Sequence, residues 1–98
     1  MNEKMFPVVV QAVAGEGYTV YAYMLDGTIR KVSVEELVKR GGVMEKLKDR
    51  DFFVNALTVM NDTVAWDLSG HFDPADCIDI DPFYVEECEV VSDPIEVA

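Results

Sequence analysis

Hydrophobic residues occur in short runs along this 98-residue chain, separated by glycine, aspartate and asparagine. The runs at 7–13, 18–25 and 28–32 are rich in valine, tyrosine and isoleucine, which favour pleated strands over helices. Asp26-Gly27 separates the second run from the third, and a two-residue Asp-Gly loop is typical of a type I′ turn. The pattern therefore predicts three strands, of which the last two form a hairpin.

The middle of the chain has helical spacing instead of alternation. The segment Ser33-Val34-Glu35-Glu36 fits a capping box at the start of a helix that ends near Arg40, before two glycines. Residues 43–47 predict an irregular or 3-10 turn. The segment 49–55 predicts a second short helix, with Asp49 as its N-cap.

Two further strands are expected at 56–60 and 63–66, joined through Asn61-Asp62, which is a weaker turn signal than Asp-Gly. The large apolar side chains expected in the core are Trp66, Phe52, Phe53, Leu37 and Leu47. The order of elements predicts an α+β fold: a mainly antiparallel sheet of about four to five strands with two short helices. We expect one domain over residues 1–78, followed by an acidic C-terminal extension over residues 79–98.

Charge is distributed unevenly along the chain. Of 19 acidic and 8 basic residues, which give a formal net charge of −11, residues 67–98 carry ten acids and no lysine or arginine. The small number of basic side chains disfavours binding to nucleic acid or to an anionic membrane. No apolar run approaches the roughly 20 residues that a membrane-spanning helix needs. Uneven charge favours an interaction surface, although an acidic tail that only improves solubility explains it equally well.

Motifs of catalysis and of metal binding are missing. The only histidine, His71, has no spacing to Ser69 or Cys77 that matches a known nucleophile signature. The C-terminal acids lack the spacing of a calcium loop, and two cysteines with one histidine cannot complete a four-ligand zinc site. We therefore expect no enzyme activity, no cofactor and no metal. Without a CxxC pair, Cys77 and Cys88 are interpreted as reduced thiols of a cytoplasmic protein, with a disulfide between them as the alternative.

A series of small motifs runs from Leu25 to Cys77. The motifs are Asp26-Gly27, Ile29 and Val32, Leu37, Gly42-Val43-Met44, Leu47 with Asp49 and Phe52, Val64 to Trp66, and Asp73-Pro74-Ala75-Asp76-Cys77. In this order they resemble a small, widespread bacterial family known only as a domain of unknown function, whose members are sometimes described as antitoxin-like. The resemblance implies an α+β fold and an intracellular protein, and it supplies no catalytic residue. The acidic end beyond Cys77 departs from the family pattern.

These observations favour a non-enzymatic protein-interaction module, with the antitoxin-like member of a toxin–antitoxin pair as its concrete form. Ten negative charges would attract a basic protein partner, such as a toxin, over long range, with the alternating acids and valines of 78–97 docking along it. Open strand edges would also allow a homodimer. The residues expected to bind the partner are Asp79, Asp81, Glu86, Glu87, Glu89, Tyr21 and Tyr23.

The two tyrosines are included because alternation places them on one face of their strand, where an amphipathic patch is typical of interfaces. A half-exposed strand face without a partner is the alternative interpretation of the same pattern. The alternative function is a small-molecule-binding or regulatory domain with a pocket between the sheet and the helices.

Overall fold

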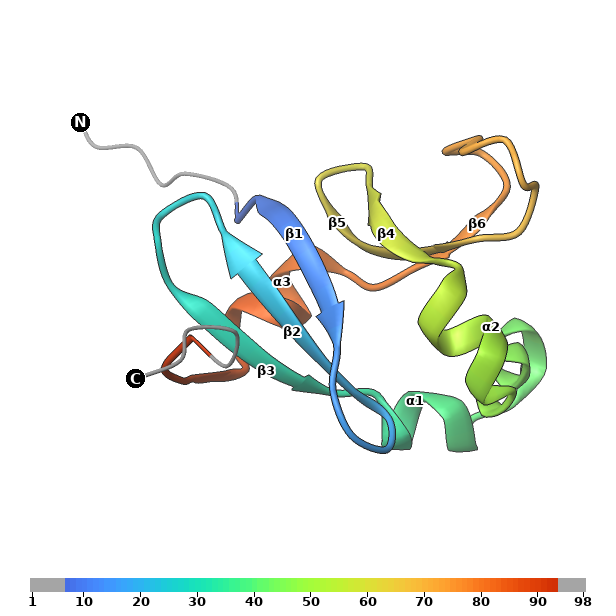
Figure 1. Cartoon of the computed structure of the whole chain (residues 1–98), viewed down its shortest axis with the longest axis horizontal. Coiled ribbons are helices and arrows are strands. Elements are labelled where there is room, and N and C mark those ends of the chain that lie inside the picture. The colour runs from blue at the N-terminus through green and yellow to red at the C-terminus, as the bar shows by residue number, and fades with distance from the viewer. Residues whose placement is uncertain (1–6, 94–98) are drawn as a thin grey trace.

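The computed structural model describes residues 7–93 and contains two antiparallel sheets (Figure 1). The first sheet has the order β1 (Val9–Ala14), β2 (Thr19–Met24), β3 (Ile29–Ser33) and β7 (Glu89–Val90). The second has the order β4 (Leu57–Met60), β5 (Thr63–Asp67) and β6 (Cys77–Asp79). The predicted α+β class with mainly antiparallel pairing is confirmed, with the strands divided between two sheets instead of one.

Four short helical segments accompany the sheets. They are α1 (Glu35–Lys39), the 3-10 helix η1 (Gly42–Lys48), α2 (Arg50–Asn55) and α3 (Pro82–Glu86). Asp49 caps α2 as predicted, because its carboxylate accepts the backbone N–H of Asp51 at 3.0 Å. Within residues 7–93, no helix has the length and apolar character needed to cross a membrane.

The capping box predicted at Ser33 is not formed. Ser33 is the last residue of β3 and pairs with Thr19 of β2, and the next N–H, that of Val34, donates to the Tyr18 carbonyl at 2.9 Å. The N-cap position of α1 is therefore occupied by Val34, one residue later than predicted. As a result, α1 starts after Val34 without a side-chain cap.

The Asp26-Gly27 hairpin forms, but its turn is not the two-residue type I′ loop. The N–H of Met24 donates to the Thr28 carbonyl at 2.8 Å, so three residues form the loop, and only Gly27 has a positive φ, of 92°. This is the pattern of three-residue hairpin loops that end in a left-handed residue. The Asp26 carboxylate supports the turn by accepting the Thr28 N–H at 2.9 Å.

The weaker turn signal, Asn61-Asp62, forms the tight hairpin between β4 and β5. Both residues have a positive φ, 56° and 63°, while Met60 and Thr63 pair directly across the loop. Two consecutive left-handed residues between paired strands define the type I′ geometry. Asparagine and aspartate tolerate this conformation better than other residues with a side chain.

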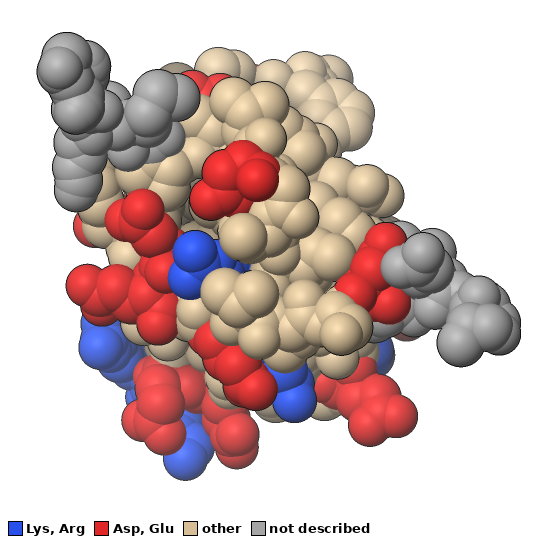
Figure 2. Space-filling view, turned by 90° about the vertical axis from the view of Figure 1, so that its left-hand side faces the viewer, with Lys and Arg blue, Asp and Glu red and all other residues tan. Residues whose placement is uncertain are grey.

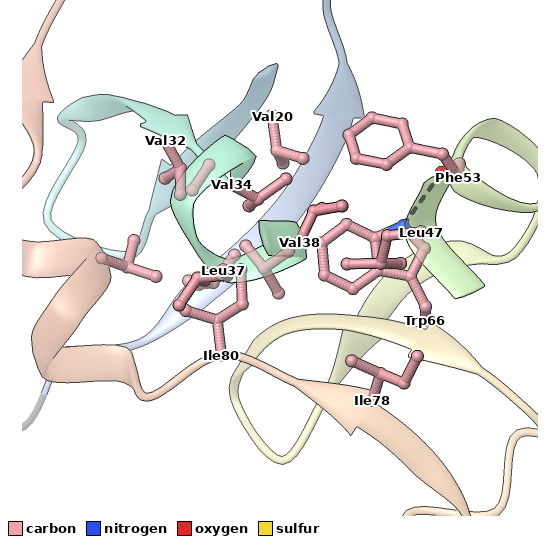
Figure 3. Packing of buried hydrophobic residues seen from close by; sticks show 14 of the residues in the cluster. Val20, Val32, Val34, Leu37, Val38, Leu47, Phe53, Trp66, Ile78 and Ile80 are labelled. Carbon is pink, nitrogen blue, oxygen red and sulfur yellow. Dashed lines mark hydrogen bonds between the residues drawn. The ribbon is translucent and has the colours of Figure 1, made fainter. Parts of the chain in front are cut away.

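The core lies between the sheets and the helices (Figure 3). Trp66, Phe53 and Leu47 are fully buried, and Leu37 is nearly so, as predicted. The indole N–H of Trp66 donates to the Phe53 carbonyl at 2.9 Å, which provides a donor for a carbonyl near the end of α2. Phe52, also expected in the core, is only half-buried and packs at its margin.

The boundary expected after residue 78 falls inside β6. Ile80 and Val85, which follow it, are buried in the same core as Trp66. The helix α3 contacts β3 and β5, and β7 then pairs with β3 at the margin of the first sheet (Figure 1). The segment 79–90 is therefore packed into the fold, while residues 94–98 of the expected extension lie outside the described residues.

Candidate interaction surfaces

The outer face of the four-stranded sheet carries both predicted tyrosines. Val20, Ala22 and Met24 of β2 are buried, so the alternating Tyr21 and Tyr23 lie on the opposite face, where both are half-buried. The hydroxyl of Tyr23 donates to the Asp93 carboxylate at 2.6 Å.

One of the predicted acids joins the tyrosines on this face. Tyr21 is opposite Lys31 of β3, and Lys31 is opposite Glu89 of β7. Directly opposite residues in an antiparallel sheet point to the same side, so Tyr21, Lys31 and Glu89 form one cross-strand row. The structure therefore brings Tyr21, Tyr23 and Glu89 together, with one lysine between them.

The remaining predicted acids are distributed over other elements. Glu86 is the last residue of α3 and is half-buried, and Glu87 is the C-cap residue that follows it and is exposed. Asp81 is exposed and caps α3 by accepting the Phe83 N–H at 2.9 Å. Asp79 belongs to β6 in the second sheet, on the other side of the molecule in Figure 1. The predicted binding residues therefore do not form one patch.

Exposed acids without a basic partner are the main electrostatic feature of the C-terminal third. The acids of this kind are Asp73, Asp76, Asp79, Asp81, Glu87 and Glu89. Within residues 7–93, the ion pairs closer than 4.0 Å join Lys39 to Glu36 and Lys48 to Glu45, and neither involves these six carboxylates. Figure 2 shows carboxylates spread over the side of the molecule that lies at the left in Figure 1, with fewer basic groups among them.

Arg30 holds the C-terminal segment against the first sheet. Its Nη1 donates to the carbonyl of Glu86 at 2.5 Å and to that of Cys88 at 3.1 Å, and its Nε is buried without a partner among residues 7–93. Sequence reasoning missed this role. Alternation places Arg30 on the same side of β3 as the fully buried Val32, and a cation on the core side of a strand needs buried acceptors.

A small cavity lies beside Arg30, between the β2–β3 hairpin and α3. Its volume is about 320 Å³, and its lining residues are Pro7, Val8, Met24, Leu25, Asp26, Arg30 and Glu86. The side-chain and backbone hydrogen bonds from Thr28 hold the pKa of Asp26 below its usual range. The cavity thus combines an apolar wall with one cation and two carboxylates.

A larger open groove, of about 610 Å³, lies between α2 and the loop that follows β5. Asp67 organises that loop, because its carboxylate accepts the N–H of Ser69 at 3.0 Å and that of Phe72 at 3.1 Å. The hydroxyl of Ser69 also donates to the Asp67 carboxylate. The Ser69 hydroxyl oxygen in turn accepts the His71 N–H at 2.8 Å. The Ser69 hydroxyl therefore stabilises the conformation of the loop through these hydrogen bonds. No signal in the sequence indicated this groove.

The ionisation of Asp67 is favoured by the loop that it organises. Burial opposes the charge, but the N–H groups of Phe72, Ser69 and Gly70 and the hydroxyl of Ser69 outweigh that effect, so the pKa of Asp67 is lowered. The backbone at Phe72 is left-handed, with φ of 57°, and its side chain is 63% exposed. A large apolar ring is thus displayed at the groove in a strained conformation.

Both cysteines are free thiols. Burial raises the pKa of Cys77, and the neighbouring aspartates raise it further. Burial also raises the pKa of Cys88, although the Arg30 guanidinium opposes the shift. The thiols are therefore protonated near neutral pH. Among residues 7–93, no three potential ligands of histidine, cysteine, aspartate or glutamate come close enough together to hold a metal ion.

Comparison of the chain with protein-family models, with curated proteins and with solved structures found no match. The resemblance to a bacterial family of unknown function therefore stays a prediction. The fold and the surfaces described above carry the functional argument.

Proposed function

We propose that this protein is a non-enzymatic interaction module that binds a basic protein partner through the exposed carboxylates of its C-terminal third. The observation that carries the proposal is the set of six exposed carboxylates without an ion-pair partner among residues 7–93. Unpaired charges of one sign attract an oppositely charged partner over long range and accelerate association. The antitoxin-like role, in the cytoplasm, is the concrete form of this proposal.

The fold changes which side chains the partner would contact. Ile78, Ile80 and Val85, three apolar members of the alternating segment, are buried in the core. They serve the fold and are not free to dock along a partner. The carboxylates between them remain at the surface, so the proposed contact is electrostatic over most of this segment. The apolar component would come from Tyr21 and Tyr23, which lie near Glu89 on the outer face of the first sheet.

The test compares two variants with equal changes in charge. The first carries Asp79→Asn, Asp81→Asn, Glu87→Gln and Glu89→Gln; asparagine at 81 keeps an N-cap for α3. The control carries Glu16→Gln, Glu35→Gln, Glu36→Gln and Glu45→Gln. All four positions are exposed and lie in residues 1–66, where nine acids are nearly balanced by eight bases. Each tagged protein is used to capture partners from the native host, and the bound proteins are identified.

Wild type and control should retain the same basic protein at low salt and release it as salt is raised, whereas the first variant should not retain it. Growth inhibition by that basic protein alone, relieved by co-expression, would support the antitoxin-like form. Recovery of no basic protein, or equal recovery by the two variants, would contradict the proposal. Light scattering on the purified protein tests the homodimer through the strand edges of β6 or β7.

The cavity beside Arg30 supports a second candidate function, a small-molecule-binding domain. Its volume of about 320 Å³ and its convergent Asp26, Arg30 and Glu86 fit a small ligand with both charged and apolar parts. Thermal-shift screening of charged metabolites should find compounds that raise the melting temperature of wild type but not of Leu25→Asp, which places a charge in the wall. A screen in which no compound separates the two proteins argues against this candidate.

A further inference from the structure

The charged residues that line the groove between α2 and the loop after β5 are all acidic. Its lining contains the carboxylates of Asp49, Asp51 and Asp67 and, among residues 7–93, no lysine or arginine. The loop hydrogen bonds lower the pKa of Asp67. Asp49 and Asp51 stand at the exposed start of α2. The groove therefore complements a cation.

Aromatic and aliphatic side chains form the rest of the lining, with Phe52 and Phe72 as the largest. The Phe52 ring already has the ammonium of Lys46 at 5.4 Å from its centroid, so Phe72 is the groove phenylalanine that we assign to an incoming cation. The Phe72 ring is 63% exposed and stands on a loop whose backbone is fixed by Asp67 and Ser69. A ligand would therefore bind with little additional ordering of the loop.

We propose that this groove binds an arginine side chain, together with an adjacent apolar residue, from an extended segment of the basic partner. A guanidinium is planar, so it can stack on a phenyl ring while it donates to a carboxylate, whereas an ammonium offers only a point charge. The guanidinium would stack on the Phe72 ring, and the apolar neighbour would contact Leu68. This inference rests on the proposed function for the source of the segment, and it adds a second contact, separate from the carboxylates at 79, 81, 87 and 89.

The probe is a capped pentapeptide with arginine at its centre, flanked by leucines and terminal glycines. The matched control peptide has citrulline, which is neutral but nearly the same shape, in place of arginine. Each is titrated into isotopically labelled full-length protein, and the backbone amide shifts are followed by NMR. The protein variants are Phe72→Asn and Asp51→Asn, with Phe83→Asn, an exposed phenylalanine outside the groove, as control.

The arginine peptide should shift amides of residues 49–58 and 67–72 and bind at least tenfold more tightly than the citrulline peptide. Phe72→Asn should lose that tenfold preference, and Asp51→Asn should weaken binding severalfold, while Phe83→Asn binds like wild type. Asparagine accepts a left-handed backbone, so Phe72→Asn should also raise the melting temperature by about 4–8 °C, which separates lost binding from lost folding.

Shifts outside the groove, equal binding of the two peptides, or unchanged binding by a stable Phe72→Asn would each overturn the inference. The two proposals can fail separately. If the native partner is retained by Phe72→Asn but lost by the variant lacking the carboxylates at 79, 81, 87 and 89, the groove inference fails and the proposed function stands. If the arginine peptide binds in the groove but no basic partner is found, the groove stands and the proposed function fails.

Discussion

Replacing Arg30 with methionine should loosen the C-terminal segment from the rest of the fold. Arg30 donates to the carbonyls of Glu86 and Cys88, which end α3 and precede β7. Hydrogen bonds from a charged donor contribute roughly 1.5–3 kcal/mol each to stability. Arg30 is half-buried, so the lower end of that range applies, about 3 kcal/mol for the two bonds.

Part of that contribution is offset within the wild-type protein. The Nε of Arg30 is buried without an acceptor among residues 7–93, and such a donor costs about 1 kcal/mol or more. Methionine removes this cost and keeps much of the apolar stem. We therefore expect Arg30→Met to lower the free energy of unfolding by about 2 kcal/mol. In a domain of this size, the loss corresponds to about 8–16 °C in melting temperature.

Denaturant unfolding measures the loss, and hydrogen exchange locates it. Exchange of the amides of residues 85–91 should accelerate in Arg30→Met, while the β4–β5 hairpin keeps its protection. Lys31→Met is the matched control: Lys31 is exposed and adjacent in β3, so its replacement should change stability by less than about 0.5 kcal/mol. If Arg30→Met is as stable as Lys31→Met, and its exchange pattern is unchanged, the proposed anchoring role is wrong.

Three further measurements test other parts of the structure. Asp62→Gly should raise the free energy of unfolding by roughly 0.5–1 kcal/mol in thermal melts, because glycine adopts the positive φ of the type I′ turn without strain; a less stable variant would contradict the turn assignment. The pKa of Asp67 is lowered in the fold, so its stabilisation is present above the unfolded pKa of about 4 and disappears as pH falls through the folded value. In an NMR titration, the amides of Ser69 and Phe72 should report a midpoint below about 4, and a midpoint above it would exclude the loop network. At pH 8, Cys88 should react with a thiol reagent more slowly than in urea, because burial raises its pKa; equal rates would show that the thiol is accessible.

Local features of the sequence predicted most elements because they depend on neighbours in the chain. Alternation in β2 separates buried Val20 and Ala22 from half-exposed Tyr21, and this pattern holds in the structure. The side chain of Asp49 caps the helix that follows it. Glycine and aspartate marked where the hairpins turn, but the type of each turn depended on the register of the paired strands, which placed the type I′ geometry at Asn61-Asp62.

The capping box predicted at Ser33 is wrong because strand pairing, which depends on distant residues, determines the backbone there. A serine followed by glutamate three residues later favours an N-cap, but the backbone of Ser33 is already committed to pairing with Thr19. Ladder hydrogen bonds between strands are set by residues far apart in the sequence. They therefore override a local preference that is worth only about 1 kcal/mol.

The sequence by itself determined that this protein has short strands and short helices, and that its negative charge is concentrated in residues 67–98. Only the tertiary structure decided what that acidic segment does. The apolar residues of this segment pack in the same core as Val9 of β1. Hydrogen bonds from Arg30 hold the backbone of the segment against β3. The groove beside Phe72 likewise exists only because α2 and the loop after β5 meet in space. These features join residues that are distant in the chain, and local composition and periodicity carry no information on such contacts.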